Sequence, residues 1–405
     1  MRFTSAISAL TDGPDAVRDV IEQTTAGLAD PGDGSSHSDA GGADATFVLA
    51  FSSGHHPDLW DTFASRLRTA FPLATSLGCT AEGTIGDGRE LERQASVSLL
   101  AGSLPGVDFR PFRVTQDTLD DDEWVDRLGP ADGDPTFLVL GDPFSLDVRR
   151  FLSGTQESHP GRPVIGGMAS GAHQPGDNRL LADGAVHADG LVGVAITGDV
   201  AVDSVVSQGC RPIGEHYVVT QGEANILRGL RNQPAMKVLQ EVASGLPPQE
   251  QSLLQHGIFV GCAIDEYRSS FARGDFLIHS IVHADPETGT LAISGEVRPG
   301  TTVQFHVRDA DSADEDLREM LARVSSGVGS GGDDPSYAGA ALFSCNGRGT
   351  RMWDTPGHDV GVLRTSAGAV PVAGFFCAGE LGPIGGRNFI HGYTASVALF
   401  RPRTG

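Results

Sequence analysis

The sequence predicts an α/β protein of two subdomains, in which mixed sheets are covered by helices. The chain has 405 residues, more than one hydrophobic core usually serves, so two domains are expected. Hydrophobic residues make up 39% of the chain and charged residues 20%, a balance typical of globular proteins. A unit of strand, helix-like segment and second strand recurs three times along the chain, which indicates an α/β architecture.

The first element is a capped amphipathic helix at residues 12–28. It begins with Asp and Pro, and apolar residues follow at helical spacing. A loop rich in Gly, Ser and Asp then occupies residues 29–44. The apolar run at 45–51 predicts a buried strand that opens the first recurring unit.

The recurring unit combines a buried strand, a turn, a helix-like segment and a second strand that ends in glycines. Its copies span residues 46–86 (with a helix at 58–71), 135–172 and 340–386. A further strand follows each copy, at residues 95–102, 190–198 and 395–401. Continuous apolar runs that alternate with helices indicate sheets covered on both faces.

The middle of the chain has a different pattern. Residues 224–246 are interpreted as a pair of helices broken at Pro234. Four strands in an antiparallel meander are expected at residues 256–264, 275–285, 289–297 and 301–309. A helix capped by Ser312 is expected at 312–327. The predicted domains are therefore residues 1–223 and 224–405.

Composition argues against several classes of partner and site. The net charge of −23 repels phosphate backbones and anionic lipids, so neither nucleic acid nor membrane is expected as a partner. No apolar run approaches the ~18 residues of a membrane helix, and the first residues lack a secretory signal, so a cytoplasmic location is expected. Five scattered cysteines without a CxxC pair indicate neither a disulfide framework nor a zinc site.

Motifs of several large enzyme classes are missing from the sequence. It contains no P-loop, no GxSxG elbow and no HExxH helix. A GxGxxG match at residues 327–332 follows a predicted helix, whereas a dinucleotide-binding loop must follow a strand, so it is interpreted as a linker. No cofactor, no metal and no enzymatic activity are expected.

The strongest local signal is the segment Cys345, Asn346, Gly347, Arg348 and Gly349, which follows an apolar strand. Its glycines permit unusual backbone conformations and leave N–H groups open to a ligand. The planar guanidinium of Arg348 suits a carboxylate or phosphate. Because open α/β sheets hold ligands at strand ends, these residues are candidates for a binding site. The alternative is that Arg348 pairs with a structural acid.

A second dense segment, residues 374–394, contributes Glu380, Arg387 and His391. Glu380 lies among glycines and apolar residues, so it either pairs with Arg348 or Arg387 or holds a ligand amine. Cys345, His391 and Glu380 are also candidates for a thiol–imidazole–carboxylate set. Binding is the preferred interpretation, and catalysis is the alternative.

Taken in order, these segments resemble the FIST proteins (F-box and intracellular signal transduction domain). The residues that carry the resemblance lie at 77–86, 164–172, 189–202, 209–220, 303–317, 341–349 and 374–400. The resemblance implies a cytoplasmic sensory module of two subdomains that binds a small ligand, for which an amino acid is the candidate, and needs a separate signalling protein as partner. Neither an F-box nor a kinase output is expected in this chain. The alternatives are a Cys-dependent enzyme that uses Cys345 with His391, and a protein-binding scaffold without a small ligand.

Overall fold

The computed structural model describes residues 1–29, 44–121, 124–268, 270–271, 274–328 and 337–403. The loop predicted at 29–44 and the glycine motif at 327–332 fall largely outside these residues. The chain forms two compact units. The first comprises Met1–Val206, Leu317–Ile390 and Thr394–Gly405, and the second comprises Ser207–Asp316 with His391–Tyr393. This division differs from the expected 1–223 and 224–405, because the last part of the chain joins the first unit.

The first unit contains three six-stranded sheets. The first sheet has, in spatial order, β1 (Arg2–Ser8), β6 (Val97–Ser103), β2 (Phe47–Ser53), β3 (Thr75–Ala81), β10 (Leu180–Ala182) and β11 (Ala185–His187). The second has β7 (Val107–Val114), β12 (Leu191–Gly198), β8 (Thr136–Gly141), β9 (Val164–Met168), β23 (Glu380–Ile384) and β24 (Arg387–His391). The third has β13 (Val200–Gln208), β25 (Thr394–Pro402), β21 (Gly339–Cys345), β22 (Val372–Cys377), β4 (Gly83–Gly86) and β5 (Arg89–Glu92).

The recurring unit of the sequence forms the centre of each sheet. The strand pairs β2–β3, β8–β9 and β21–β22 are parallel, as a strand–helix–strand crossover requires. The strand that follows each copy, β6, β12 or β25, pairs antiparallel with the first strand of that copy. The predicted α/β class is thus confirmed, and the three sheets share one strand order.

Each sheet contains a segment that follows the second strand of a different copy of the recurring unit. The β4–β5 hairpin follows β3 in sequence but pairs with β22 of the third sheet. The β10–β11 hairpin follows β9 and pairs with β3 of the first sheet, and β23, which follows β22, pairs with β9 of the second. The exchange runs in a closed cycle, so each sheet is completed by a neighbouring copy.

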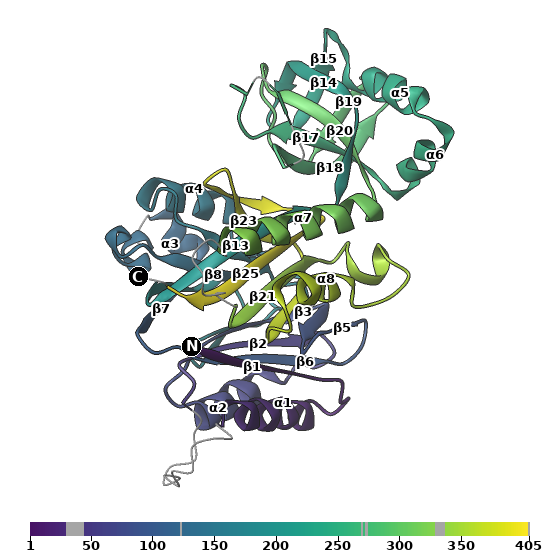
Figure 1. The fold of residues 1–405 in the computed structure, drawn as a ribbon. Coiled ribbons are helices and arrows are strands. Elements are labelled where there is room, and N and C mark those ends of the chain that lie inside the picture. The colour runs from purple at the N-terminus through teal and green to yellow at the C-terminus, as the bar shows by residue number, and fades with distance from the viewer. Residues whose placement is uncertain (30–43, 122–123, 269, 272–273, 329–336, 404–405) are drawn as a thin grey trace. The chain divides into compact units, whose positions relative to one another are not determined.

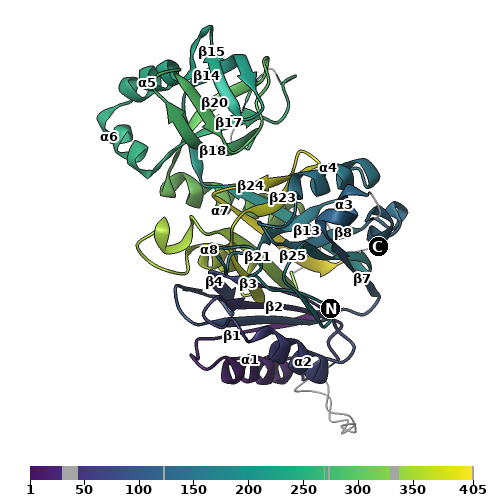
Figure 2. The ribbon, with the colours of Figure 1, turned by 180° about the vertical axis from the view of Figure 1, so that it is seen from behind.

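Helices cover the outer face of each sheet, and a shared apolar core fills the space between the sheets. Figure 1 and Figure 2 show α1 (Gly13–Leu28) and α2 (Trp60–Ala70) against the first sheet. The second sheet is covered by α3 (Gln116–Asp120), η1 (Val125–Leu128) and α4 (Val148–Ser158), and the third by α7 (Ala310–Val328) and α8 (His358–Ala367). The short helix η2 (Ala131–Gly133) precedes β8 and buries none of its residues. The shared core contains Phe51, Leu140 and Phe343, one from each sheet. Each sheet is therefore buried on both faces.

A glycine occupies the same position in the second strand of each copy. The residues are Gly78, Gly166 and Gly374, and a Cβ added to Gly374 would lie 1.8 Å from the carbonyl oxygen of Leu342, its register partner. The strands of each parallel pair thus approach closely because no side chain intervenes.

Replacing Gly374 with alanine should lower the free energy of unfolding by at least about 1–3 kcal/mol, because backbone must move to admit the methyl group. Gly361 of α8 is the matched control, since nothing lies within 4 Å of a Cβ added there. Gly361→Ala should raise the free energy of unfolding by about 0.5–1 kcal/mol through helix propensity. Urea denaturation measures both changes, and equal effects of the two substitutions would contradict the close approach.

The second unit is inserted between β13 and the body of α7. Its strands, in spatial order, are β14 (Cys210–Glu223), β20 (Thr302–Arg308), β17 (Ile258–Ala263), β18 (Phe276–Asp285), β19 (Thr290–Ile293), β15 (Ile226–Leu230) and β16 (Gln233–Pro234). Pairing of β15 with β14 closes the sheet into a small barrel around its own core. The helical segments are α5 (Ala235–Gly245), α6 (Pro248–Gln251) and η3 (Ser252–His256).

Two predictions for this region were wrong. Residues 224–234 form strands β15 and β16, not the first helix of a pair, because Arg231 and Asn232 adopt left-handed conformations that make a turn. Strand β20 pairs with β17 and β14, so the four expected strands do not form a simple meander. The following helix also begins two residues before Ser312, at Ala310.

Candidate functional site

The predicted segment at residues 345–349 forms the turn after β21. The backbone N–H of Asn346 donates to the carbonyl of Cys377 over 2.9 Å, and that of Arg348 donates to the carbonyl of Cys345 over 2.8 Å. Gly349 has a φ of +57°, whereas Gly347 does not adopt the left-handed conformation. The turn therefore requires glycine at position 349, and it holds Arg348 at the end of the central strand of the third sheet.

The guanidinium of Arg348 is fully buried and forms an ion pair with Asp359 of α8. Its Nε and Nη2 donate to the two carboxylate oxygens over 2.7 and 2.8 Å. Trp353 lies beneath this group, with the Arg348 Cζ 5.0 Å from its ring centroid. The alternative predicted from the sequence, in which Arg348 pairs with a structural acid, therefore accounts for Nε and Nη2 of the guanidinium. The third nitrogen, Nη1, takes no part in this ion pair.

Asp359 is held as a carboxylate by its surroundings. Burial favours its neutral form, but the charge of Arg348 and hydrogen bonds from Arg348, His358 and Ser344 together keep the pKa of Asp359 well below its ordinary value. The hydroxyl of Ser344 donates over 2.6 Å, and Nδ1 of His358 lies 3.0 Å from the carboxylate. The His358 ring stacks on Trp353 with centroids 3.6 Å apart. These contacts give the ion pair a rigid geometry.

Glu380, the first residue of β23, is fully buried. Its Oε2 accepts hydrogen bonds from the backbone N–H and the hydroxyl of Thr394, over 3.2 and 2.8 Å. Burial raises the pKa of Glu380 to about 8, although the Thr394 hydrogen bonds, a hydrogen bond with the Cys345 thiol and the charge of Arg348 act in the opposite direction. The carboxyl group is therefore electrostatically linked to both Cys345 and Arg348.

Three buried polar atoms of this region have no hydrogen-bond partner among the described residues. They are Nη1 of Arg348, Oε1 of Glu380 and Oδ1 of Asn346. Buried polar groups in folded proteins are almost always hydrogen-bonded, so these three atoms have the capacity for further hydrogen bonds, for example to water or to a ligand. The three atoms are one donor nitrogen and two oxygens, and the described contacts of their residues lie within the first unit.

Arg387 and His391 are not brought into this cluster by the described contacts. Arg387 is exposed at the opposite end of the β23–β24 hairpin from Glu380, and its guanidinium lies over the ring of Phe389, 5.4 Å from the centroid. His391 is buried and belongs to the second compact unit. Of the two arginines that the sequence offered as partners of Glu380, Arg348 is the one whose charge acts on the Glu380 carboxyl.

Sequence reasoning missed Asp359, Thr394 and Trp353. Asp359 comes 11 residues after Arg348, and it follows a glycine and a histidine at the start of a helix. An acidic residue in the first turn of a helix is common, so it gave no signal of a buried ion pair. Thr394 was part of a segment singled out by the sequence, but nothing indicated that its hydroxyl would reach Glu380.

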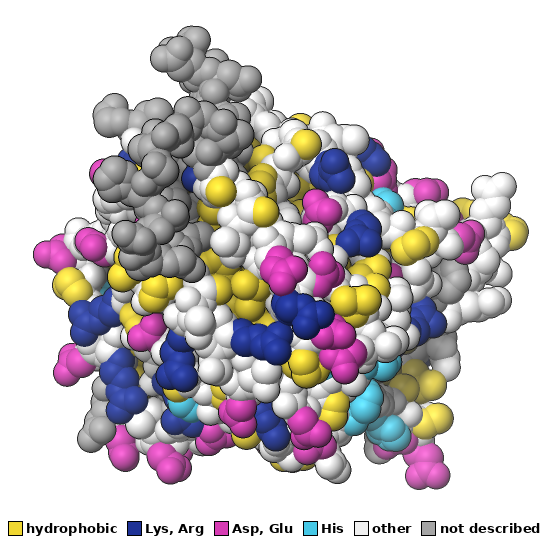
Figure 3. Space-filling view, turned by 90° about the horizontal axis from the view of Figure 1, so that it is seen from below, with side chains coloured by type: hydrophobic (Ala, Val, Ile, Leu, Met, Phe, Trp, Pro, Cys, Tyr) yellow, Lys and Arg dark blue, Asp and Glu magenta, His cyan; other side chains and the backbone are white. Residues whose placement is uncertain are grey.

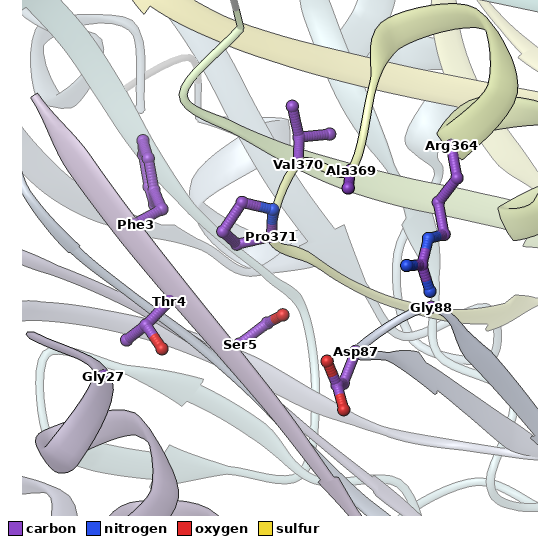
Figure 4. Close-up of a pocket in the computed structure, with 10 residues that line it drawn as sticks. All are labelled: Phe3, Thr4, Ser5, Gly27, Asp87, Gly88, Arg364, Ala369, Val370 and Pro371. Carbon is purple, nitrogen blue, oxygen red and sulfur yellow. The ribbon is translucent and has the colours of Figure 1, made fainter.

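A separate cavity of about 220 Å³ lies elsewhere in the first unit and does not contain the predicted residues. Figure 4 shows Asp87, Arg364 and Ser5 around it, with Phe3 and Pro371 on its apolar side.

On the face shown in Figure 3, basic and acidic side chains of the described residues are interspersed. Within the described ranges, no cluster of three or more His, Cys, Asp or Glu side chains is suited to a metal ion. The helices of the described ranges are all too short or too polar to cross a membrane.

Comparison with known proteins identifies relatives over nearly all of the chain. Residues 46–233 match the FIST N domain, and residues 235–383 match the FIST C domain. An uncharacterised protein of Mycobacterium tuberculosis is 39% identical over 364 residues, which cover 89% of this chain and 92% of the relative. An uncharacterised protein of Mycobacterium bovis is 38% identical over 364 residues, with the same coverage of both chains. The two matched regions meet at residue 234, inside the second compact unit.

Proposed function

The chain belongs to the FIST family, whose domains are sensory domains of signal transduction, and from this premise we propose that it binds an amino acid at Arg348 and Glu380. The observation that supports this proposal is the set of three unpartnered buried atoms on Arg348, Glu380 and Asn346. A ligand that supplies their missing hydrogen bonds removes the penalty of burying them unpaired.

The polarity of these atoms favours a zwitterion. The Arg348 Nη1 donates to the carboxylate of the ligand, while the Glu380 and Asn346 oxygens accept from its ammonium group. Asp359 already holds the other two nitrogens of the Arg348 guanidinium, so the ligand carboxylate meets Nη1 alone and not a fork of two nitrogens. An ammonium group beside Glu380 also favours the ionised carboxylate, which burial otherwise disfavours.

We also propose that the site binds its ligand without transforming it and reports to a separate signalling protein in the cytoplasm. The Cys345 thiol interacts with the Glu380 carboxyl, which places the thiol beside the proposed ligand site. All five cysteines are free thiols, as expected in a reducing compartment. The alternative of a Cys345–His391 enzyme requires direct contact between these two side chains.

A thermal-shift screen with the common amino acids tests the proposed ligand class. At least one amino acid should raise the melting temperature, because a ligand that binds only the folded state stabilises it. The corresponding carboxylic acid without the amine, and the amine without the carboxylate, should give much smaller shifts. No shift with any amino acid at millimolar concentration would contradict the proposal.

Glu380→Gln should weaken binding of that amino acid at least about tenfold, because a charge-assisted hydrogen bond worth roughly 1.5–3 kcal/mol is lost. Isothermal titration calorimetry measures this change. Glu287→Gln is the control, because Glu287 is an exposed carboxylate of the second unit. Equal affinity of the Glu380 variant and the wild type would exclude Glu380 as the ammonium partner.

A further inference from the structure

Two cysteines lie side by side at the ends of neighbouring strands. Cys345 is the last residue of β21 and Cys377 is the last residue of β22, and the two are register partners in this parallel pair. Neighbouring strands lie about 4.8 Å apart, and disulfide-bonded cysteines have Cα atoms about 4.4–6.8 Å apart. The backbone spacing at this position therefore permits a disulfide.

The two side chains also point to the same side of the sheet. Phe343 and Phe375 are register partners two residues earlier, and their rings contact each other with centroids 5.7 Å apart. Because side chains alternate along a strand, Cys345 and Cys377 share the face of these rings. The Cys345 sulfur also lies close enough to Cys377 to influence its ionisation. The thiols are thus neighbours in space as well as in register.

The surroundings of the two thiols differ. Cys345 is partly exposed, its sulfur accepts a hydrogen bond from the Gly347 N–H over 3.4 Å, and the charges of Arg348 and Arg351 act on it. Cys377 is fully buried, and burial raises the pKa of its thiol well above the ordinary value. An oxidant therefore reaches Cys345 first.

We propose that Cys345 and Cys377 form a reversible redox pair that hydroperoxides oxidise to a disulfide. The Cys345 thiolate attacks a peroxide oxygen, so an S–O bond forms, the O–O bond breaks and the leaving oxygen takes up a proton. The Cys377 sulfur then attacks the sulfenic acid of Cys345. An S–S bond forms, the S–O bond breaks, and the Cys377 proton departs with the hydroxyl group as water. The two thiols lose two electrons in total, and the peroxide gains them.

Oxidation changes the site described above, and this consequence rests on the proposed function. Formation of the disulfide removes the thiol that interacts with Glu380 and draws Cys345 toward β22. The turn that carries Asn346 and Arg348 follows Cys345 directly, so the donor and acceptor atoms proposed to hold the ligand move with it. The oxidised protein should therefore bind the amino acid at least about tenfold more weakly.

Treatment of the reduced full-length protein with hydrogen peroxide tests the pair. Peptide mapping after alkylation should find a Cys345–Cys377 cross-link, and dithiothreitol should reverse it. Cys377→Ser should trap a sulfenic acid at Cys345 that a dimedone probe detects, and Cys345→Ser should prevent both products. Cys79→Ser is the matched control, since Cys79 is a buried thiol near Cys377 and its loss should leave the cross-link intact.

A cross-link from Cys345 to another cysteine, or a Cys345 that is oxidised without any cross-link, would overturn the redox pair. Titration of the amino acid against reduced and oxidised protein tests the consequence for binding. If the reduced protein binds no amino acid, the proposed function fails, whereas the peptide map still decides the redox pair. Equal affinities of both forms would overturn the coupling between them.

Discussion

Asp359→Ala should lower the free energy of unfolding by about 3–5 kcal/mol, because it leaves the fully buried guanidinium of Arg348 without its counter-ion. The hydroxyl of Ser344 and the ring of His358 lose a hydrogen-bond partner in the same variant. Urea denaturation of wild type and variant, followed by circular dichroism, measures the change.

Asp354→Ala is the matched control, since Asp354 is an exposed carboxylate in the segment between β21 and α8. It should change the free energy of unfolding by less than about 0.5 kcal/mol. The double variant Arg348→Met with Asp359→Leu should be more stable than Asp359→Ala, because no unpaired charge remains. If Asp359→Ala costs no more than Asp354→Ala, the ion pair does not stabilise the fold.

As the pH rises from about 5 to about 8, the free energy of unfolding of the wild type should fall relative to that of the Glu380→Gln variant. Burial raises the pKa of Glu380 to about 8 from an ordinary value of 4.5, so the folded protein keeps a proton that the unfolded chain releases. The stabilisation is fully present below pH 4.5, declines as the pH rises and is lost above pH 8. One pKa unit corresponds to about 1.4 kcal/mol, so the total is several kcal/mol.

Urea denaturation at intervals between pH 5 and pH 8 measures this difference. Glu90 is also buried with a pKa raised to about 8, mainly by burial, but it is present in both proteins and its effect largely cancels. Glu287→Gln is a control at an exposed carboxylate. Parallel stability profiles of wild type and Glu380→Gln across this range would show that Glu380 is ionised in the folded protein.

Much of the first unit could be predicted because its signals are local. The apolar strands, the amphipathic helices and the threefold recurrence all depend on residues close together in sequence. The segment at 224–234 was misread because Leu227 and Leu230 stand at helical spacing, whereas the barrel core buries them from a strand. Here tertiary pairing outweighs a local preference.

Only part of the candidate site could be predicted from local sequence signals. Arg348 was recognised because it stands between glycines at the end of an apolar strand, and Glu380 because it lies among glycines and apolar residues. Their partners could not be recognised in the same way. Asp359 and Thr394 meet them only through the packing of α8 and β25 against β21 and β23. The unpartnered atoms are likewise a property of three-dimensional packing, since no sequence pattern reports which atom lacks a neighbour.

The exchange of hairpins also bears on how the molecule is made. The ribosome synthesises the β4–β5 hairpin early, but its partner strand β22 is synthesised near the end of the chain. Ile85 of β4 therefore cannot pair with Gly374, its register partner in β22, until most of the chain has been made. Until then the emerging chain presents unsatisfied backbone groups along β4, which are open to pairing with other chains. The nascent polypeptide therefore needs protection for most of its synthesis, and the third copy closes the whole assembly when it arrives.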